Sequence, residues 1–496
     1  MQVKNRIELP NNHEITMRTI YWISLFSLIY FFETKVEADE STPAASGSGA
    51  VVNNAVSSTG SAGNNAASGT GSPTGGSVLG TGGDFADILG KKPLSYAIGP
   101  FNFSPMLEVS ETYNDNMFFN NGNRKASWLT QVQLGLQLEL SHGLNHYDLQ
   151  YGFRSWTWSS SPADDYLDQF VAGKSHIEFT DSNRLDLKAN YIDSHNLRGT
   201  YFTAPGLPYS QIPSPDTFHE YNGEVKYRYG AASATGNLEL ITGVNDLTYD
   251  TRPTVTYSYN KTRYFLIPGF YYRIMPKTQL LAQVEATWYR YHDATTARQL
   301  DFDLQRYLVG AQWQATVQTS GKLRLGYMVQ EFTTGAPVSV GASPSKGISG
   351  FTGDVGLEWS PLTYSRFSLN AMRNIMPTTG YGTSATVNQV SIGWSHDWTS
   401  QVNSHMNLGY TYIENRNVNP STTANNSSQV NNEYYSANVG VDYAFREWVS
   451  FGLNYTFNSL SSSYNVMNYD QNRIMMYVTL NPRAASQTSA PWQFNF

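Results

Sequence analysis

The chain has 496 residues, of which 14% are aromatic and only 14% charged, and it contains no cysteine. A formal charge of -7, with no Lys/Arg cluster and no glycine-rich nucleotide motif, argues against a nucleic-acid partner. Beyond the N-terminus, no apolar run is long enough to cross a bilayer as a helix. Helical membrane proteins, disulfide-stapled domains and lipoproteins with a modified cysteine are therefore excluded.

Residues 1–38 are predicted to be a secretory signal peptide. Thr19 to Phe32 form an uncharged apolar run after Arg18, and Val36-Glu37-Ala38 supplies small residues where a signal peptidase reads. The run is short for a membrane helix, so cleavage before Asp39 is favoured over the alternative of an uncleaved anchor. Met17 is an alternative start codon.

Residues 39–99 are predicted to be a low-complexity periplasmic linker. No charged residue occurs from Ser41 to Gly83, and such a composition cannot bury enough apolar surface to offset its ordering entropy. Residues 84–92 (DFADILGKK) are more amphipathic. They are consistent with a short helix that plugs the mouth of a barrel, but a partly ordered leader into the first strand is favoured.

Residues 100–480 read as strand-sized segments of alternating apolar and polar residues. Between residues 128 and 140, Gln131, Gln133, Gln137 and Glu139 share one parity, and the other parity carries Trp128, Val132, Leu134, Leu136, Leu138 and Leu140. These segments run roughly ten to fifteen residues, longer than the five or six usual in soluble sheets, which favours a membrane. We therefore predict an all-β fold, a transmembrane antiparallel β-barrel of about 18 strands. The strands are predicted to begin near Phe103, Trp128, His146, Leu167, Arg184, Phe218, Asn237, Ser258, Leu280, Asp301, Leu323, Phe351, Arg366, Val387, Asn403, Tyr434, Val449 and Arg473.

The predicted connections alternate in length along the chain. Bacterial outer-membrane barrels have short periplasmic turns and long external loops, so this alternation predicts a Gram-negative outer-membrane location with both termini in the periplasm. The tight connections are 142–145, 180–183, 231–234, 275–278 and 399–401, and the long ones include 114–125, 196–217, 334–346 and 415–431. Residues 481–496 are predicted to be a C-terminal tail or an extension of the last strand, because Trp492, Phe494 and Phe496 alternate.

Two short patterns near the ends of this region resemble a known family. Leu107 to Asn116 (LEVSETYNDN), Leu453 to Phe457 (LNYTF) and Tyr469 to Arg473 (YDQNR) are similar to the opening and closing patterns of the outer-membrane beta-barrel porin 2 family, whose members often accompany exopolysaccharide or capsule gene clusters. The resemblance covers Pro100 to Leu480, with motifs of moderate specificity. Tyr-Asn-Asp-Asn could by itself be an Asx-rich turn that caps any strand.

The resemblance implies a passive conduit for polysaccharide export. Its partners would be outer-membrane lipids, a hydrophilic substrate that is a glycan, and periplasmic polysaccharide-export components. A general or solute-specific uptake porin is the alternative, and an outer-membrane hydrolase or a surface adhesin is less favoured.

Polar residues on the parity opposite to the apolar ones are predicted to line the barrel. Since about eighteen strands enclose more space than side chains fill, a water-filled channel is expected unless loops or the leader occupy it. The charges are mixed in sign, which predicts weak ion selectivity, or cross-strand ion pairs that stiffen the wall. The pore-lining candidates are Asp148, Gln150, Arg154, Lys174, His176, Glu178, Glu224, Lys226, Arg228, Gln283, Glu285, Arg324, Asp354, Glu358 and Arg473.

Aromatic residues near the external rim are candidates for stacking on sugar rings. Trp156 and Trp158 share parity with Arg154, which would aim them inward, although an aromatic girdle at the membrane interface is the alternative. Tyr201, Phe202 and Tyr209 lie in the longest loop. That loop would either fold inward as a constriction or remain exposed.

No catalytic, metal or cofactor site is predicted. No His has a Ser two residues away, the spacing that puts both side chains on one strand face, so only a cross-strand Ser–His pair stays open. Asp193 and His195 do share a face, which we interpret as a hydrogen bond at the rim. No metal-ligand cluster stands out. The chain is therefore expected not to be an enzyme.

Overall fold

A computed structural model describes residues 95–200, 209–231, 233–292, 301–316, 318–333, 347–377, 383–416, 429–463 and 467–480, although not the side chains of 315 and 316. The predicted signal peptide, the linker up to residue 94 with its candidate helix, Tyr201, Phe202 and the tail 481–496 lie outside the described residues.

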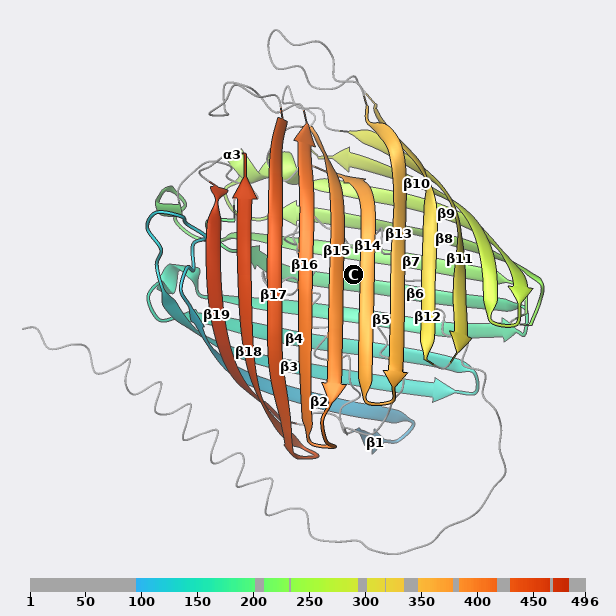
Figure 1. Cartoon of the computed structure of the whole chain (residues 1–496), viewed down its shortest axis with the longest axis horizontal. Helices are drawn as coiled ribbons and strands as arrows, with labels where there is room; N and C mark the ends of the chain where they lie inside the picture. Colours follow the sequence, from blue (N-terminus) through green and yellow to red (C-terminus); the bar gives the residue numbers. More distant parts are fainter. Residues whose placement is uncertain are drawn as a thin grey trace, which may run out of the picture. The chain divides into compact units, whose positions relative to one another are not determined.

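The described strands form one sheet that closes on itself as an antiparallel barrel (Figure 1). Each strand from β2 onward pairs with the next, and β19 pairs back with β2, so that Ile474 lies opposite Tyr113 and Leu480 opposite Leu107. The predicted closed barrel of eighteen strands is confirmed. The strands are β2 (Phe101–Asn114), β3 (Ser127–His142), β4 (Asn145–Trp158), β5 (Tyr166–Thr180), β6 (Asn183–Asn196), β7 (Asp216–Tyr229), β8 (Gly236–Tyr249), β9 (Lys261–Met275), β10 (Thr278–Tyr291), β11 (Phe302–Thr316), β12 (Thr319–Phe332), β13 (Ser349–Leu362), β14 (Ser365–Met376), β15 (Ser384–Asp397), β16 (Val402–Arg416), β17 (Gln429–Arg446), β18 (Val449–Ser462) and β19 (Tyr469–Leu480).

A further short strand, β1 (Tyr96–Ile98), precedes the barrel and pairs with β2 through a tight turn. Gly99 in that turn has a φ of 61°, which glycine adopts without steric cost. A strand of three residues is too short to show alternation, so the sequence pattern did not predict it. The largest shift in a predicted start is at β17, which begins at Gln429 instead of Tyr434, because Gln429 to Glu433 is mostly polar.

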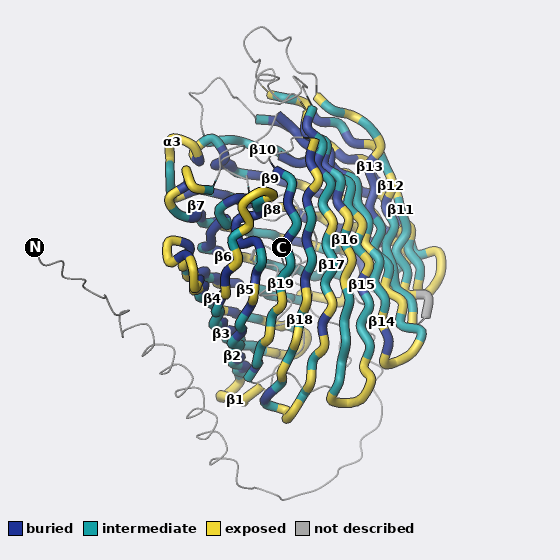
Figure 2. Tube along the Cα trace, turned by 60° about the vertical axis from the view of Figure 1, so that its left-hand side comes forward, coloured by how far each residue is buried: buried dark blue, intermediate teal, exposed yellow. Residues whose placement is uncertain are grey.

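The two faces of the strands differ in chemistry. Large apolar side chains such as Leu149, Val309 and Leu453 are 52–64% exposed on the outer face, as expected of side chains that contact lipid. Buried residues are interleaved with more exposed ones along the strands (Figure 2). Among the described residues, no helix is both long and apolar enough to span a bilayer.

The connections at the two ends of the barrel differ in length, as predicted. Tight hairpins join His142 to Asn145, Thr180 to Asn183 and Met275 to Thr278 at one end. The loops at the other end are longer and include the short helices η1 (Pro162–Asp164), η2 (Tyr209–Gln211), α3 (Pro253–Thr256) and η3 (Tyr257–Tyr259). We call this end the long-loop end, and the other the short-turn end.

Candidate functional site

The inner wall of the barrel is polar. All of the predicted pore-lining residues lie on the inner strand face, opposite the exposed apolar residues, and many of them contact one another across strands. Strand register decides which of them meet, because side chains of paired residues on the same face stand next to each other.

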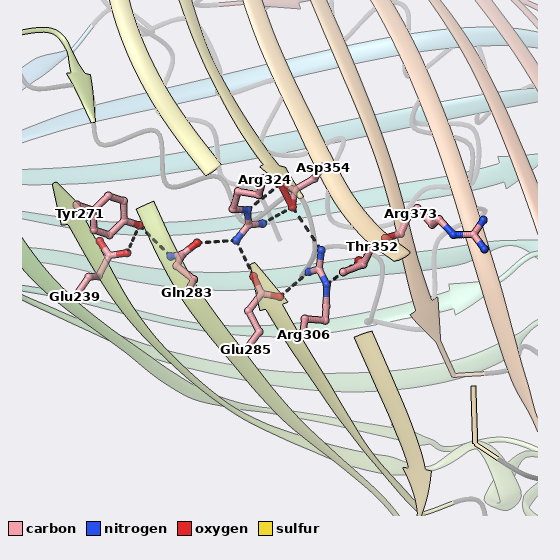
Figure 3. Close-up of polar contacts among 9 residues, drawn as sticks. All are labelled: Glu239, Tyr271, Gln283, Glu285, Arg306, Arg324, Thr352, Asp354 and Arg373. Atoms are coloured by element: carbon pink, nitrogen blue, oxygen red, sulfur yellow. Dashed lines mark hydrogen bonds and ion pairs between the residues drawn. The ribbon is translucent and has the colours of Figure 1, made fainter. Parts of the chain in front are cut away.

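Arg324 on β12 lies at the centre of a buried cluster of charges (Figure 3). Its guanidinium forms a two-point pair with Asp354 on β13, with a Nε–Oδ2 distance of 2.8 Å, and its Nη1 donates to Glu285 Oε1 at 2.6 Å. Nη1 also donates to Gln283 Oε1 at 2.9 Å. Bidentate and charge-assisted bonds of this kind hold the guanidinium in one orientation.

Arg306 on β11 supplies the second positive charge of the cluster. Its Nη1 lies 2.5 Å from Glu285 Oε2, its Nη2 lies 3.6 Å from Asp354 Oδ1, and its Nε donates to Thr352 Oγ1 at 3.1 Å. Two guanidinium groups therefore face two carboxylates, and the cluster has no net charge. Burial is tolerated because every charge has an opposite partner within hydrogen-bond reach.

The chain of polar contacts continues from this cluster toward β5. Gln283 donates to the Tyr271 hydroxyl at 2.9 Å, and Tyr271 donates to Glu239 at 2.8 Å (Figure 3). Glu239 pairs with Arg228, whose Nε lies 3.1 Å away. The next pairs along the wall are Lys226–Asp186 (3.0 Å), His176–Asp186 (2.5 Å), His176–Glu178 (3.3 Å) and Lys188–Glu224 (3.1 Å). We call this connected wall, from β5 to β13, the ionic half.

Sequence reasoning missed several members of the ionic half. Asp186, Lys188, Glu239 and Arg306 share the inner parity with the predicted residues, so a complete count of parity would have found them. Tyr271 carried no such signal, because the neighbouring tyrosines of β9 face outward.

Of the remaining candidates, two lie on the outermost strands of the ionic half and the others lie outside it. Gln150 donates to Asp148 at 2.8 Å, and Arg154 donates to Gln133 at 2.8 Å across β3 and β4. Lys174 lies on β5 within the ionic half and Glu358 is exposed on β13, whereas Arg473 is on β19, next to the barrel seam.

The loop between β2 and β3 folds over the inner face at the long-loop end. Met117 and Phe118 pack on the inward-facing Leu129, Trp156 and Trp158. On the other side, Phe119 packs in a cluster with the inner-face residues Val430, Leu460 and Tyr469. The loop therefore lies across the inner face of adjacent strands from β17 to β4 and narrows the mouth there. Phe119 has a φ of 52°, a strained value for a bulky side chain.

Trp156 and Trp158 lie on the inner face but are only 4% and 3% exposed. Trp156 Nε1 donates to Asp168 Oδ2 at 2.5 Å, and its ring meets His195 edge-on at 5.2 Å. With the β2–β3 loop in place, no ring face is open to a passing solute. A role of these rings in glycan stacking stays a prediction, and it requires the loop to move.

Three loops hold one another at this mouth. Tyr209, the described member of the predicted loop aromatics, stacks on Phe118 with ring centroids 4.0 Å apart. The Arg198 guanidinium lies 4.9 Å from the same ring and pairs with the buried Asp164, at a Nε–Oδ1 distance of 2.7 Å. The loop after β6 thus encloses Phe118 and is itself bound to the loop after β4 through Asp164, so a shift of one loop must disturb the others.

The two motifs that carry the family resemblance meet at the barrel seam. Asp115 accepts the backbone N–H and the side-chain amide of Asn472, both at 2.7 Å. Asn116 donates to the carbonyl of Asp470 at 2.8 Å, and Gln471 donates back to the carbonyl of Asn116 at 2.8 Å. These bonds explain the spacing of both motifs, because they join the first barrel strand to the last.

A few contacts bear on catalysis. Ser141 Oγ lies 3.0 Å from His146 Nδ1, a cross-strand pair in an exposed turn, and His146 has no carboxylate partner among the described residues. The predicted Asp193–His195 bond is wrong: His195 pairs with Asp168 at 2.9 Å, while Asp193 accepts from Tyr166. Within the described ranges, no group of three or more His, Asp or Glu could hold a metal ion.

The chain matches one protein family and is similar to several solved structures. A family model described as "Putative beta-barrel porin 2" matches residues 92–482, whereas the search of curated proteins found no match. Solved structures similar to it include OpdK (13% identity, TM-score 0.39) and OccK2 (11%, 0.41) of Pseudomonas aeruginosa. Both alignments cover 76% of this chain, and 98% and 97% of those chains respectively. The siderophore receptor PirA of the same organism is 8% identical with a TM-score of 0.40, over 78% of this chain and 81% of PirA.

Proposed function

The chain belongs to the beta-barrel porin 2 family and is an outer-membrane β-barrel porin, and from this premise we propose that it is a passive conduit for the export of a polysaccharide, either an exopolysaccharide or a capsule. The export role is supported by the resemblance of its end motifs to a family that accompanies such gene clusters. A porin is a channel, so the contacts near Ser141 and His195 are assigned structural roles.

The balance of charges on the inner wall is the observation that favours a neutral or weakly charged substrate. A pore selective for anions or cations presents a ring of one sign to the solute. Here Arg306 and Arg324 are balanced by Glu285 and Asp354, and the cluster is buried. A glycan with few charges would pass such a wall without the free-energy cost of displacing counter-ions from unpaired charges on the wall.

We also propose the arrangement of the chain in the cell. The short-turn end would face the periplasm, as in other bacterial outer-membrane barrels, and both termini would then be periplasmic. Residues 1–38 would be removed as the signal peptide, and residues 39–99 would form a periplasmic linker that export components of the envelope would contact.

Deletion of the gene tests the export proposal. We expect loss of the surface polysaccharide while its cytoplasmic synthesis continues, measured by glycan staining of intact cells and by analysis of the intracellular polymer. Restoring the gene on a plasmid is the control. Unchanged surface polysaccharide, together with slower growth on a small external solute, would instead favour the alternative of an uptake porin.

A further inference from the structure

On β14 to β18 the inner wall carries amides and hydroxyls in place of the charges of the ionic half. Beyond the first residues at the short-turn end, the described inner-face residues of β14 to β18 carry no charge. The inner-face charges of these strands, such as Arg366 and the His405–Asp442 pair, lie near the short turns. We call the following mid-strand residues the amide track: Asn370, Ser391, Asn407, Asn438, Asn454 and Thr456.

Strand register places the members of the amide track beside one another. Asn370 is opposite Ser391, and Asn407 is opposite Asn438, which in turn is opposite Thr456. The side-chain amide of Asn438 donates to Asn454 at 2.6 Å and to Thr456 at 2.9 Å. The track therefore extends over five strands, with Gly393 opposite Asn407 and Gly409 opposite Ser391 where β15 and β16 pair.

Exposure separates the amide track from the ionic half. Asn370 and Asn407 are exposed, and neither side chain forms a hydrogen bond with another described residue. Arg324 and Glu285 are only 1% and 4% exposed and are bonded to each other. A solute inside the barrel thus meets the free amides of Asn370 and Asn407 on one side, whereas the central charges of the ionic half, such as Arg324 and Glu285, are already paired and buried.

Glycines on the inner face leave space along the wall for the polar side chains of the track and its neighbours. At Gly393 a Cβ atom would lie 2.4 Å from Ser368 Oγ and 2.8 Å from Asn407 Oδ1, and at Gly409 it would lie 2.5 Å from Ser436 Oγ. Any larger residue would displace these polar side chains. The sequence therefore leaves room for them to lie along the wall.

We propose that the amide track is the contact surface for an uncharged, polyhydroxylated polymer, that is, a neutral glycan. A carboxamide offers both donors and an acceptor, which match sugar hydroxyls, and it carries no charge that must lose its hydration. Many weak contacts of this kind allow a chain to bind and to move on. The inference rests on the proposed conduit function, but not on the direction of transport.

Block of the ion current through the purified barrel in planar bilayers tests this surface. Maltoheptaose is the neutral probe, and a heptamer of galacturonic acid is the anionic probe of equal length. We expect maltoheptaose to block more strongly. The double variant Asn370→Ala/Asn407→Ala should raise the concentration for half block roughly tenfold, because two neutral hydrogen-bonding side chains are lost.

Asn190→Ala is the matched control, since Asn190 accepts from Asn222 on the inner face of the ionic half. It should leave the block by maltoheptaose unchanged, and preserved conductance shows that each variant is folded. Equal or stronger block by the anionic probe would overturn the inference, and so would unchanged block in the double variant. If the deletion strain kept its surface polysaccharide, the export proposal would fail, but the bilayer results would still test the amide track independently.

Discussion

Arg324 shows how single residues set the properties of the inner wall. Arg324 is 1% exposed, yet its guanidinium contacts Asp354 on the neighbouring strand β13, and Glu285 and Gln283 on β10, two strands away. A buried pair of this kind adds little net stability compared with an apolar pair, but removal of one member leaves an uncompensated charge. Substitution of such a residue therefore lowers the stability of the fold, even though its paired and buried charge does not contact a solute in the pore.

Arg324→Ala is expected to lower the free energy of unfolding by about 3–5 kcal/mol, since Glu285 and Asp354 would then share Arg306 alone. Equilibrium unfolding of the barrel in lipid vesicles by urea, followed by tryptophan fluorescence, measures this. Arg366→Ala, at an exposed inner-face position, is the control and should change stability by less than about 0.5 kcal/mol. Equal effects of the two substitutions would contradict the importance of the cluster.

At the scale of elements, the β2–β3 loop determines how open the mouth is. Its three apolar residues contact the inner face of β3 and β4 on one side and of β17 to β19 on the other. Phe118 is also enclosed by Tyr209 and Arg198 from the loop between β6 and β7. Removal of these side chains should release the loop without affecting the strand pairing that closes the barrel.

We expect the triple variant Met117→Ser/Phe118→Ser/Phe119→Gly to increase the single-channel conductance, because the loop loses its apolar contacts with the wall. Trp156 and Trp158 should then become accessible to water. Conductance in planar bilayers and quenching of tryptophan fluorescence by iodide measure both effects. Phe101→Ser, on the outer face at the start of β2, is the control. If conductance and quenching stay at wild-type values, the loop does not narrow the mouth.

The molecule as a whole is closed by contacts between residues far apart in the chain. Asp115 and Asn116 bond to Asp470, Gln471 and Asn472 at the seam between β2 and β19. The closed wall then consists of the ionic half, whose central cluster has no net charge, a stretch of neutral amides and hydroxyls on β14 to β18, and the remaining strands β19 to β4. Charge selectivity is a property of this whole assembly, because it depends on the sum of charges around the pore.

The reversal potential in a KCl gradient is therefore expected to be close to zero for the wild-type barrel. Arg324→Met removes one positive charge from the cluster and should shift the reversal potential toward cation selectivity. A strong preference of the wild-type channel for either ion would show that the ionic half does not compensate its own charges.

The sequence by itself determined the class of fold, the number of barrel strands and the face of those strand residues whose segments alternate clearly. Alternation with a period of two is a local property, imposed on every strand by lipid on one side and water on the other. The parity of Trp128 to Leu140 is therefore readable without any knowledge of neighbouring strands. The same holds for Arg324 and Asp354, whose inner-face positions follow from their own strands.

Only the tertiary structure decided which inner-face residues meet and which stay open to a solute. The pairing of Arg306 with Glu285, and the exposure of Asn370 and Asn407, depend on the register between strands, which no single strand encodes. Burial of Trp156 likewise depends on a loop that folds back over the wall. Local patterns describe residues one at a time, whereas long-range contacts of this kind join residues of different strands. The sequence therefore predicted a polar inner wall but did not show how it divides into the ionic half and the amide track.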